Sequence, residues 1–320
     1  MKTIFFCALM ILTVALLNIS CKNKNDKGPV KSFTAGKNRF TIMVDGSIRE
    51  YYVHVPAGYK ATTAFPVVFM LHGSGGNGEK FYNISGWKEV GETENILTVF
   101  PSSAQYSCVF DDGIQKPNAE KWNSYDLELC GGETAKDDVK FLSQVIDEVK
   151  QKYAADEKRI YIVGFSNGGE MASRTAIELS NKIAAVVAAA GALPTDTNFV
   201  PLRKLPVLLQ AGNADEKLLA KLGTANPLPM DFDKLFTDFP AVQEVANTFI
   251  TAFALNPVFT KAGDSNTFIY ADYGGISGAK ENTFRFMLVK GLGHNYPNGK
   301  NHALKGAEIH WAWMKNFGIH

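Results

Sequence analysis

The stretch Arg159-Ile-Tyr-Ile-Val-Gly-Phe-Ser-Asn-Gly-Gly169 decides the fold of this 320-residue chain. A β-branched and aromatic run, residues 160–163, leads into a Gly-x-Ser-x-Gly turn, and a helix-like segment follows over residues 170–179. This order predicts a strand, a sharp turn and a helix, with the hydroxyl of Ser166 exposed at the turn as a candidate nucleophile. The alternative is an ordinary strand-to-helix turn in which Ser166 only caps the helix.

Short apolar runs that suit buried strands recur on both sides of this turn. They cover residues 65–71, 96–100, 183–190, 205–210 and 283–289. Helical patterns alternate with them, opening at Asp137 and covering residues 242–255 and 303–317. Continuous apolar strands are typical of parallel sheets buried on both faces, so we predict an α/β protein with a mostly parallel central sheet and helices on both faces.

Weaker patterns fill the rest of the chain. Residues 39–44 and 48–55 flank Asp45-Gly46 and predict a hairpin. Residues 101–136 lack clear periodicity, and residues 216–262 are expected to form a lid or to cover the edge of the sheet. Since no boundary is visible, residues 37–320 are predicted to form one catalytic domain.

The N-terminus has the pattern of a signal peptide over residues 1–20. Lys2 precedes an apolar run over residues 4–17, which is short for a membrane span. The run ends at Asn18-Ile-Ser-Cys21, which resembles a bacterial lipoprotein signal and predicts a lipid on the sulfur of Cys21. Residues 21–36 then form a flexible polar tether. We expect an exported protein, anchored to the cell-envelope membrane through Cys21; the alternative is a plain secretory signal.

The cysteine content agrees with export, and the net charge gives no support to one class of partner. The net charge is +1, and loss of residues 1–20 removes Lys2 and no acid, so the mature chain is neutral. This balance gives no support to nucleic-acid binding. Of the four cysteines, Cys7 would leave with the signal peptide and Cys21 would carry the lipid. In an oxidising compartment the other two, Cys108 and Cys130, are expected to form a disulfide. The alternative is two separately buried thiols.

Three residue types suited to acyl transfer follow predicted strands in the order Ser166, Asp215, His294. The carboxyl ends of parallel strands meet at one edge of a sheet, so these side chains are expected to lie together. His294 would take the proton of Ser166, and a carboxylate would orient the imidazole and stabilise its charged form. Other acids remain open as partners of His294: Glu216, Asp231 and Asp233.

The tetrahedral intermediate of such a reaction needs hydrogen-bond donors for its oxyanion. The backbone N–H of Asn167 is expected to be one donor, and that of Ser74, in the glycine-rich loop after residues 65–71, the other. This chemistry needs no metal ion and no organic cofactor.

Four motifs resemble one known family. They are Phe65-Pro-Val-Val-Phe-Met-Leu-His-Gly-Ser-Gly-Gly76, Val163-Gly-Phe-Ser-Asn-Gly-Gly-Glu-Met171, Gly212-Asn-Ala-Asp215 and Gly291-Leu-Gly-His-Asn-Tyr-Pro297. Together they are similar to the polyhydroxybutyrate depolymerase and feruloyl esterase family, secreted serine esterases of α/β-hydrolase fold that are also grouped with carbohydrate esterases. The resemblance implies Ser166 as nucleophile, Asp215 as the acid of the triad and His294 as base.

The chain departs from that family's pattern close to the site. The family usually has Thr at Asn213, Gly at Leu292 and Trp at Tyr296, and often Cys at Ser74. Tyr296 therefore becomes a candidate substrate-binding residue. Trp122 resembles an aromatic residue of the family's active-site-side loop and is a second candidate; the alternative is that Trp122 packs within the disulfide-bearing loop.

The resulting hypothesis is an exported serine esterase acting on feruloyl or acetyl esters of plant polysaccharide. The alternatives are a polyester depolymerase or a serine peptidase with the same triad, and a glycan-binding lipoprotein without catalysis.

Overall fold

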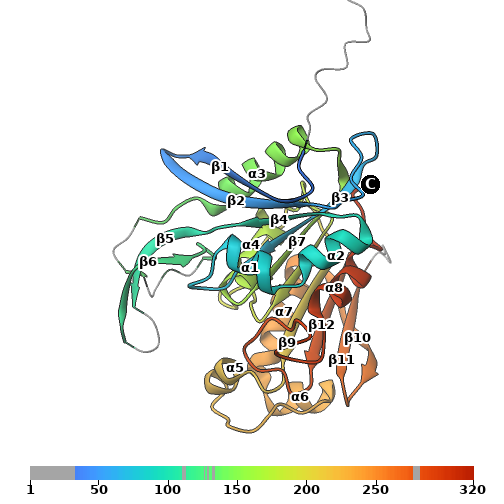
Figure 1. Ribbon diagram of the computed structural model, residues 1–320. Helices are drawn as coiled ribbons and strands as arrows, with labels where there is room; N and C mark the ends of the chain where they lie inside the picture. Colours follow the sequence, from blue (N-terminus) through green and yellow to red (C-terminus); the bar gives the residue numbers. More distant parts are fainter. Residues whose placement is uncertain (1–32, 110–112, 126, 128–129, 132–133, 277–281) are drawn as a thin grey trace, which may run out of the picture. The chain divides into compact units, whose positions relative to one another are not determined.

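A ten-stranded sheet runs through the protein (Figure 1). In sheet order its strands are β1 (Gly36–Val44), β2 (Ser47–Val55), β4 (Leu97–Pro101), β3 (Phe65–Leu71), β7 (Ala155–Phe165), β8 (Ala185–Ala189), β9 (Val207–Gly212), β12 (Thr283–Val289), β11 (Phe268–Gly275) and β10 (Leu255–Asp264). The strands from β4 to β12 run parallel to one another, and an antiparallel pair flanks them at each edge. The predicted mostly parallel central sheet is therefore confirmed.

This structure is a computed structural model that describes residues 33–109, 113–125, 127, 130–131, 134–276 and 282–320. The signal peptide predicted over residues 1–20, the predicted lipidation site Cys21 and the tether up to residue 32 lie outside the described residues. Residues Phe33–His320 form one compact unit. None of the helices in the described ranges is both long and apolar enough to cross a membrane.

Helices cover both faces of the sheet (Figure 1). One face carries α3 (Asp138–Lys152), α4 (Asn167–Glu178), α5 (Glu216–Lys221), α6 (Phe232–Asp238) and α7 (Pro240–Phe253). The other carries α1 (Gly78–Ile84), α2 (Trp87–Glu94) and α8 (Gly306–Met314). Along β3, Val67 and Phe69 enter the first core, whereas Val68 and Met70 enter the second. A central strand buried on both faces must be apolar at every position, which explains the continuous run in the sequence.

The region 216–262 covers the sheet and is not a detached lid. It contains α5, α6, α7 and most of β10, and its aromatic side chains pack onto β12. Phe249 stacks on Phe284 with ring centroids 4.8 Å apart, and Phe232 lies 5.6 Å from Phe286. Of the two expectations for this region, coverage of the sheet is confirmed.

Residues 101–136 contain a second, two-stranded sheet of β5 (Ala104–Val109) and β6 (Gln115–Lys121). Cys108 and Cys130 form a disulfide that ties β5 to the segment ahead of α3, so the predicted pairing is confirmed. The backbone N–H of Gly75 donates to the carbonyl oxygen of Glu120 at 2.8 Å. This small sheet therefore contacts the glycine-rich loop after β3.

Candidate active site

Ser166 occupies the sharp turn between the end of β7 and the start of α4. Its backbone has φ 54° and ψ −125°, a strained conformation for a residue with a side chain. Strand and helix approach so closely here that a Cβ on Gly164 would lie 1.8 Å from the carbonyl oxygen of Gly168. The two glycines of the motif are thus required by the backbone, and the hydroxyl of Ser166 is lifted out of the sheet.

Three side chains from three loops meet at this turn. The Oγ of Ser166 lies 2.9 Å from Nε2 of His294, and Nδ1 of His294 lies 2.8 Å from Oδ2 of Asp215. When Nδ1 donates its proton to the carboxylate, Nε2 presents a lone pair to the serine hydroxyl. The structure thus brings together the three residues predicted as nucleophile, base and acid, in the geometry that proton transfer from serine requires.

Asp215 is fixed by the helix that it begins. It is the N-cap of α5, and its Oδ1 accepts the backbone N–H groups of Lys217 and Leu218 at 3.0 and 3.1 Å. Burial raises the pKa of this carboxyl, but the hydrogen bond and charge of His294 and the two backbone donors outweigh burial and hold the pKa below its usual range. Asp215 is therefore held in its charged form beside the imidazole.

The other acids considered from the sequence take different positions. Asp231 caps α6, and Asp233 pairs with Lys261. Glu216 lies at the site but binds the main chain: its Oε2 accepts the backbone N–H of His294 at 3.0 Å. The ring of His294 and its backbone are thus held by two consecutive carboxylates.

Asn213 joins the loop of the acid to the loop of the histidine. Its side-chain oxygen accepts the N–H of Gly291 at 2.6 Å, and its amide donates to the carbonyl of Leu228 at 3.0 Å. The next residue, Ala214, donates its N–H to the carbonyl of Leu292 at 3.2 Å. This role of Asn213 was not predicted from the sequence. The one signal in the sequence was an asparagine two residues before the acid, and the structure shows that its amide is buried.

The two expected oxyanion donors lie on either side of the nucleophile. Asn167 is the first residue of α4, where helical N–H groups have no partner within the helix. A Cβ on Gly73 would lie 3.2 Å from Cβ of Ser166, so the loop that carries Ser74 runs directly beside the nucleophile. Among the described residues, neither the Asn167 N–H nor the Ser74 N–H has an acceptor.

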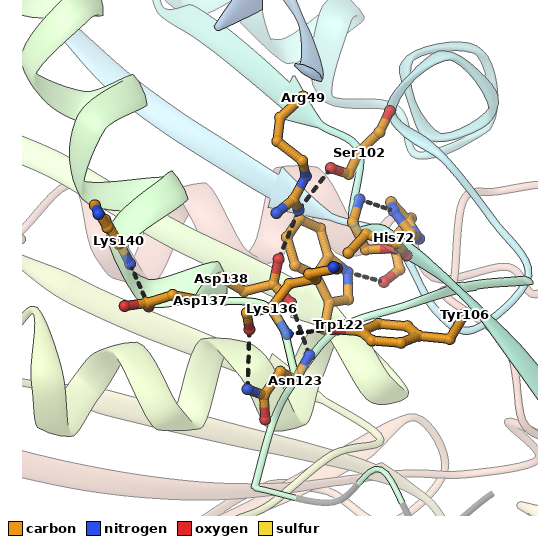
Figure 2. Close-up of polar contacts among 12 residues, drawn as sticks. Arg49, His72, Ser102, Tyr106, Trp122, Asn123, Lys136, Asp137, Asp138 and Lys140 are labelled. Carbon is orange, nitrogen blue, oxygen red and sulfur yellow. Dashed lines mark hydrogen bonds and ion pairs between the residues drawn. The ribbon is translucent and has the colours of Figure 1, made fainter. Parts of the chain in front are cut away.

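The buried side chain of His72 holds that loop through two hydrogen bonds. Its Nδ1 donates to the carbonyl of Gly73 at 2.8 Å, and its Nε2 accepts the N–H of Ser103 at 2.9 Å (Figure 2). Full burial lowers the pKa of His72 to about 4, aided by the positive charges of Arg49 and Lys80. The ring is thus neutral at physiological pH, with one donor and one acceptor, both used.

Trp122 supports the site from inside the core and does not line a substrate pocket. It is 0% exposed, and its indole N–H donates to the carbonyl of His72 at 2.8 Å (Figure 2). Its backbone N–H and carbonyl are both bound by the side-chain amide of Asn167, at 2.7 and 3.1 Å. The expectation of a substrate-contacting Trp122 is therefore wrong, because an indole without exposed surface cannot reach a ligand. Trp122 packs in the main core beside His72 and Phe141, and not within the cluster around the disulfide.

A buried ion pair fixes the segment that follows Trp122. Arg49 donates to Oδ1 of Asp138 at 2.6 Å, and Oδ2 of Asp138 accepts the N–H of Asn123 at 2.8 Å (Figure 2). Both charged side chains are almost fully buried, at 6% and 0% exposure. The guanidinium and the backbone N–H together satisfy the carboxylate, which a buried charge requires.

Tyr296 is also turned away from any ligand. It is 5% exposed, and its hydroxyl lies between the indole nitrogen of Trp87, at 2.9 Å, and Nδ1 of His310, at 3.0 Å. The expectation that Tyr296 contacts substrate is wrong, because its ring packs in the second core and its hydroxyl is bound there on both sides.

Two surface hollows lie apart from these three side chains. One of about 410 Å³ is bordered by the start of α3 and by Arg174 and Glu178 of α4. Another of about 710 Å³ is bordered by Phe65, Trp311 and neighbouring residues. Ser166, Asp215 and His294 line neither hollow, so neither one identifies the substrate.

Comparisons with known proteins agree with this geometry. The sequence model of the phospholipase/carboxylesterase family matches residues 57–226. A putative esterase, NocK of Nocardia uniformis subsp. tsuyamanensis, is 28% identical over 278 residues, which cover 81% of this chain and 73% of that protein. Feruloyl esterase B of Piromyces equi is 27% identical over 175 residues, which cover 53% of this chain and 30% of that protein.

Among solved structures, an acetyl xylan esterase from Aspergillus awamori matches with a TM-score of 0.58 at 13% identity, over 87% of this chain and 99% of that one. At this identity the match concerns the fold alone, which is the α/β-hydrolase fold expected from the motifs. With the family model matching more than half of the chain, the protein belongs to the phospholipase/carboxylesterase family of α/β-hydrolases and is a serine esterase.

Proposed function

We propose that the protein is an exported carboxylic-ester hydrolase that works through an acyl-enzyme on Ser166. The observation that carries the proposal is the continuous Ser166–His294–Asp215 contact beside the backbone N–H groups of Asn167 and Ser74, for which the described residues supply no acceptor. Feruloyl or acetyl esters of plant polysaccharide are the proposed substrates. The feruloyl esterase among the relatives supports the first, and the motif resemblance to carbohydrate esterases extends the proposal to the second.

The proposed reaction proceeds in two half-reactions. Ser166 Oγ attacks the ester carbonyl while its proton passes to Nε2 of His294, and the imidazolium is stabilised by Asp215. The N–H groups of Asn167 and Ser74 bind the oxyanion, an effect of about 3 kcal/mol for each donor. His294 then gives the proton to the leaving alcohol, and the acyl group stays on Ser166.

In the second half-reaction a water molecule attacks the acyl carbon, and His294 takes one of its protons. The same two N–H groups bind the second oxyanion. When the tetrahedral intermediate collapses, the acid leaves, the proton returns from His294 to Ser166 and the free enzyme is restored.

The test is hydrolysis by the mature protein of methyl ferulate, acetylated xylan, a hydroxybutyrate oligomer, a peptide substrate and p-nitrophenyl acetate. The Ser166→Ala and His294→Ala variants are expected to lose activity by about 10³-fold or more. His320→Ala, an exposed C-terminal residue, is the matched control for loss of an imidazole.

The panel also separates the alternatives. Turnover of the hydroxybutyrate oligomer or the peptide alone would replace the polysaccharide ester by a polyester or a peptide substrate. Sugar binding that Ser166→Ala leaves intact, in a folded parent protein without any turnover, would overturn the proposal in favour of a glycan-binding protein.

Lipid anchoring through Cys21 is the second part of the proposal, and it is supported by the signal-like sequence up to that residue. In bacterial cells grown with an alkynyl fatty acid, the full chain is expected to be labelled and Cys21→Ser to be unlabelled. Secretion of an unlabelled parent protein into the medium would contradict the anchor and leave the ester chemistry untouched.

A further inference from the structure

Four buried side chains form one continuous chain of hydrogen bonds behind the histidine loop. The indole nitrogen of Trp87 lies 2.9 Å from the hydroxyl of Tyr296, which lies 3.0 Å from Nδ1 of His310. Nε2 of His310 in turn lies 2.8 Å from the side-chain oxygen of Gln210. The exposed fractions of these side chains are between 0% and 5%, so water does not compete for the bonds. We call this chain of four residues the relay.

The protons in the relay have a single consistent arrangement. An indole nitrogen only donates, so the Tyr296 oxygen accepts from Trp87. The side-chain oxygen of Gln210 only accepts, so Nε2 of His310 is the donor there and Nδ1 accepts from the Tyr296 hydroxyl. The proton of a neutral imidazole must then sit on Nε2, which donates to Gln210. Burial lowers the pKa of His310 to about 3, in agreement with a neutral ring.

The relay joins the elements that surround the proposed triad. Trp87 begins α2, His310 lies on α8, and Gln210 lies on β9, the strand that leads to Asp215. Tyr296 lies two residues after His294 in the same loop. The relay therefore connects the acid strand and two helices of the second core to the loop of the base.

One aromatic ring of the described residues, that of Phe165, lies against both the relay and the site. Phe165, the residue before the nucleophile, has its ring centroid 5.3 Å from that of His294 and 6.3 Å from that of Tyr296. Movement of the Tyr296 ring would thus displace the Phe165 ring, and through it the ring of His294. The Tyr296 hydroxyl is bound on both sides within the relay, by Trp87 and His310.

We propose that Tyr296 is a positioning residue for His294, and that the relay fixes the loop 291–297 so that Nε2 of His294 stays within hydrogen-bond distance of Ser166. The inference deepens the proposed function and rests on it. Loss of the Tyr296 hydroxyl would leave two buried groups, the Trp87 N–H and Nδ1 of His310, without partners, and the loop would shift to pair them elsewhere.

The central test compares Tyr296→Phe with Tyr161→Phe. Tyr161 is also fully buried, on β7, and its hydroxyl donates to the carbonyl of Phe317 at 2.7 Å, outside the histidine loop. Both variants lose one buried hydroxyl, so both are expected to unfold at a lower temperature. Only Tyr296→Phe is expected to lower kcat on p-nitrophenyl acetate, by about tenfold, which corresponds to about 1.4 kcal/mol.

The separate effects on kcat and on KM distinguish positioning from general loss of structure. His294 serves in both half-reactions, so its displacement slows acylation and deacylation together and KM stays within twofold of the parent value. Equal kcat in the parent and in Tyr296→Phe, or an equal loss of kcat in Tyr161→Phe, would overturn the proposal.

A second measurement does not depend on any substrate. In ¹⁵N NMR spectra of the histidine rings, His310 of the parent is expected to carry its proton on Nε2, and the Nδ1 proton of His294 to be slow in exchange. Tyr296→Phe is expected to broaden that His294 signal, whereas Tyr161→Phe leaves it sharp. The opposite tautomer of His310, or an unchanged His294 signal in Tyr296→Phe, would contradict the relay.

These two measurements keep the relay apart from the proposed function. If Ser166→Ala retained the parent's rate, the acyl-enzyme would be wrong, and the NMR comparison would still decide whether Tyr296 positions His294. If Tyr296→Phe failed to fold, Trp87→Phe would replace it, since it removes the first donor and leaves the other two bonds in place. Trp87→Phe is then expected to lower kcat by about threefold with KM unchanged, and parent-like kcat would overturn the proposal.

Discussion

The carboxylate of Glu216 accepts the backbone N–H of His294 at 3.0 Å, while the carboxylate of the preceding residue, Asp215, binds the ring of the same histidine. A single hydrogen bond to a carboxylate contributes about 1 kcal/mol when it is partly exposed. Glu216→Ala is therefore expected to lower kcat/KM by about fivefold. Glu216→Gln, which keeps an acceptor oxygen, is expected to stay within twofold of the parent.

The control for Glu216→Ala is Glu308→Ala, which removes an exposed glutamate of α8 that pairs with Lys305. Parent-like kinetics are expected there. Identical kinetics of Glu216→Ala and the parent protein would show that the backbone of His294 is held without this carboxylate.

Gly168→Ala is expected to damage the site and the fold together. A Cβ at this position would lie 2.3 Å from the carbonyl oxygen of His72 and 2.6 Å from that of Leu71, and both are backbone atoms at the start of the oxyanion loop. We expect kcat/KM to fall more than about 100-fold, because the loop beside Ser166 must move. Gly274→Ala, on β11, has no atom within 4 Å of the added Cβ and is the matched control. Similar activity of the two variants would contradict the close approach.

Acid is expected to destabilise the protein through His72. Burial lowers its folded pKa to about 4, so between the ordinary histidine pKa and that value the unfolded chain binds a proton that the folded chain does not. The stabilisation is complete above about pH 6.5 and is lost as the pH falls toward 4, a change of about 3 kcal/mol in the free energy of unfolding. The difference between the parent protein and His72→Asn in urea unfolding from pH 4 to pH 7.5 measures it, since the buried His310, with a pKa lowered to about 3, adds to the pH dependence of both.

His72→Asn removes this titration and is expected to give a shallower dependence of unfolding free energy on pH. Thr98→Val is the control, because Thr98 is equally buried on β4 and does not titrate. Equal pH slopes for His72→Asn and the parent protein would refute a buried neutral His72.

The Cys108–Cys130 disulfide is expected to stabilise the protein by about 3 kcal/mol, because it closes a loop with a sequence separation of 22 residues in the unfolded chain. The double variant Cys108→Ser/Cys130→Ser should unfold at a lower urea concentration, and dithiothreitol should shift the parent to the same midpoint. A reductant effect of equal size on the double variant would show that the disulfide is not its cause.

The central strands and the triad were predictable because their signals are local or depend on order alone. Residues 65–71 are apolar throughout since both faces of β3 are buried, and Ser166, Asp215 and His294 each follow a strand whose carboxyl end faces the site. Gly164 of the elbow is dictated by its contact with Gly168, within five residues of chain, whereas Gly168 is dictated by the carbonyl oxygens of Leu71 and His72 at the end of another strand.

The remaining parts depend on contacts that no local pattern records. β6 reads Gln-Lys-Pro-Asn-Ala-Glu-Lys, which is polar and contains a proline, because it pairs on one side only, with β5. Tyr296 and Trp122 are aromatic residues near the site in sequence, and whether such a ring faces a ligand or the core is decided by Trp87, His310 and Asn167, between 14 and 209 residues away. The role of Asn213 likewise arises only when two loops meet.

The backbone of Ser166, with φ 54° and ψ −125°, sets folding and chemistry against each other at one position. Glycine adopts this conformation without strain, whereas a residue with a Cβ costs about 1–3 kcal/mol there. Lineages selected for stability alone would therefore drift to glycine at position 166 and keep the fold without the hydroxyl. The serine persists only while hydrolysis itself is under selection, so its presence in a relative's sequence is a record of use as well as of descent.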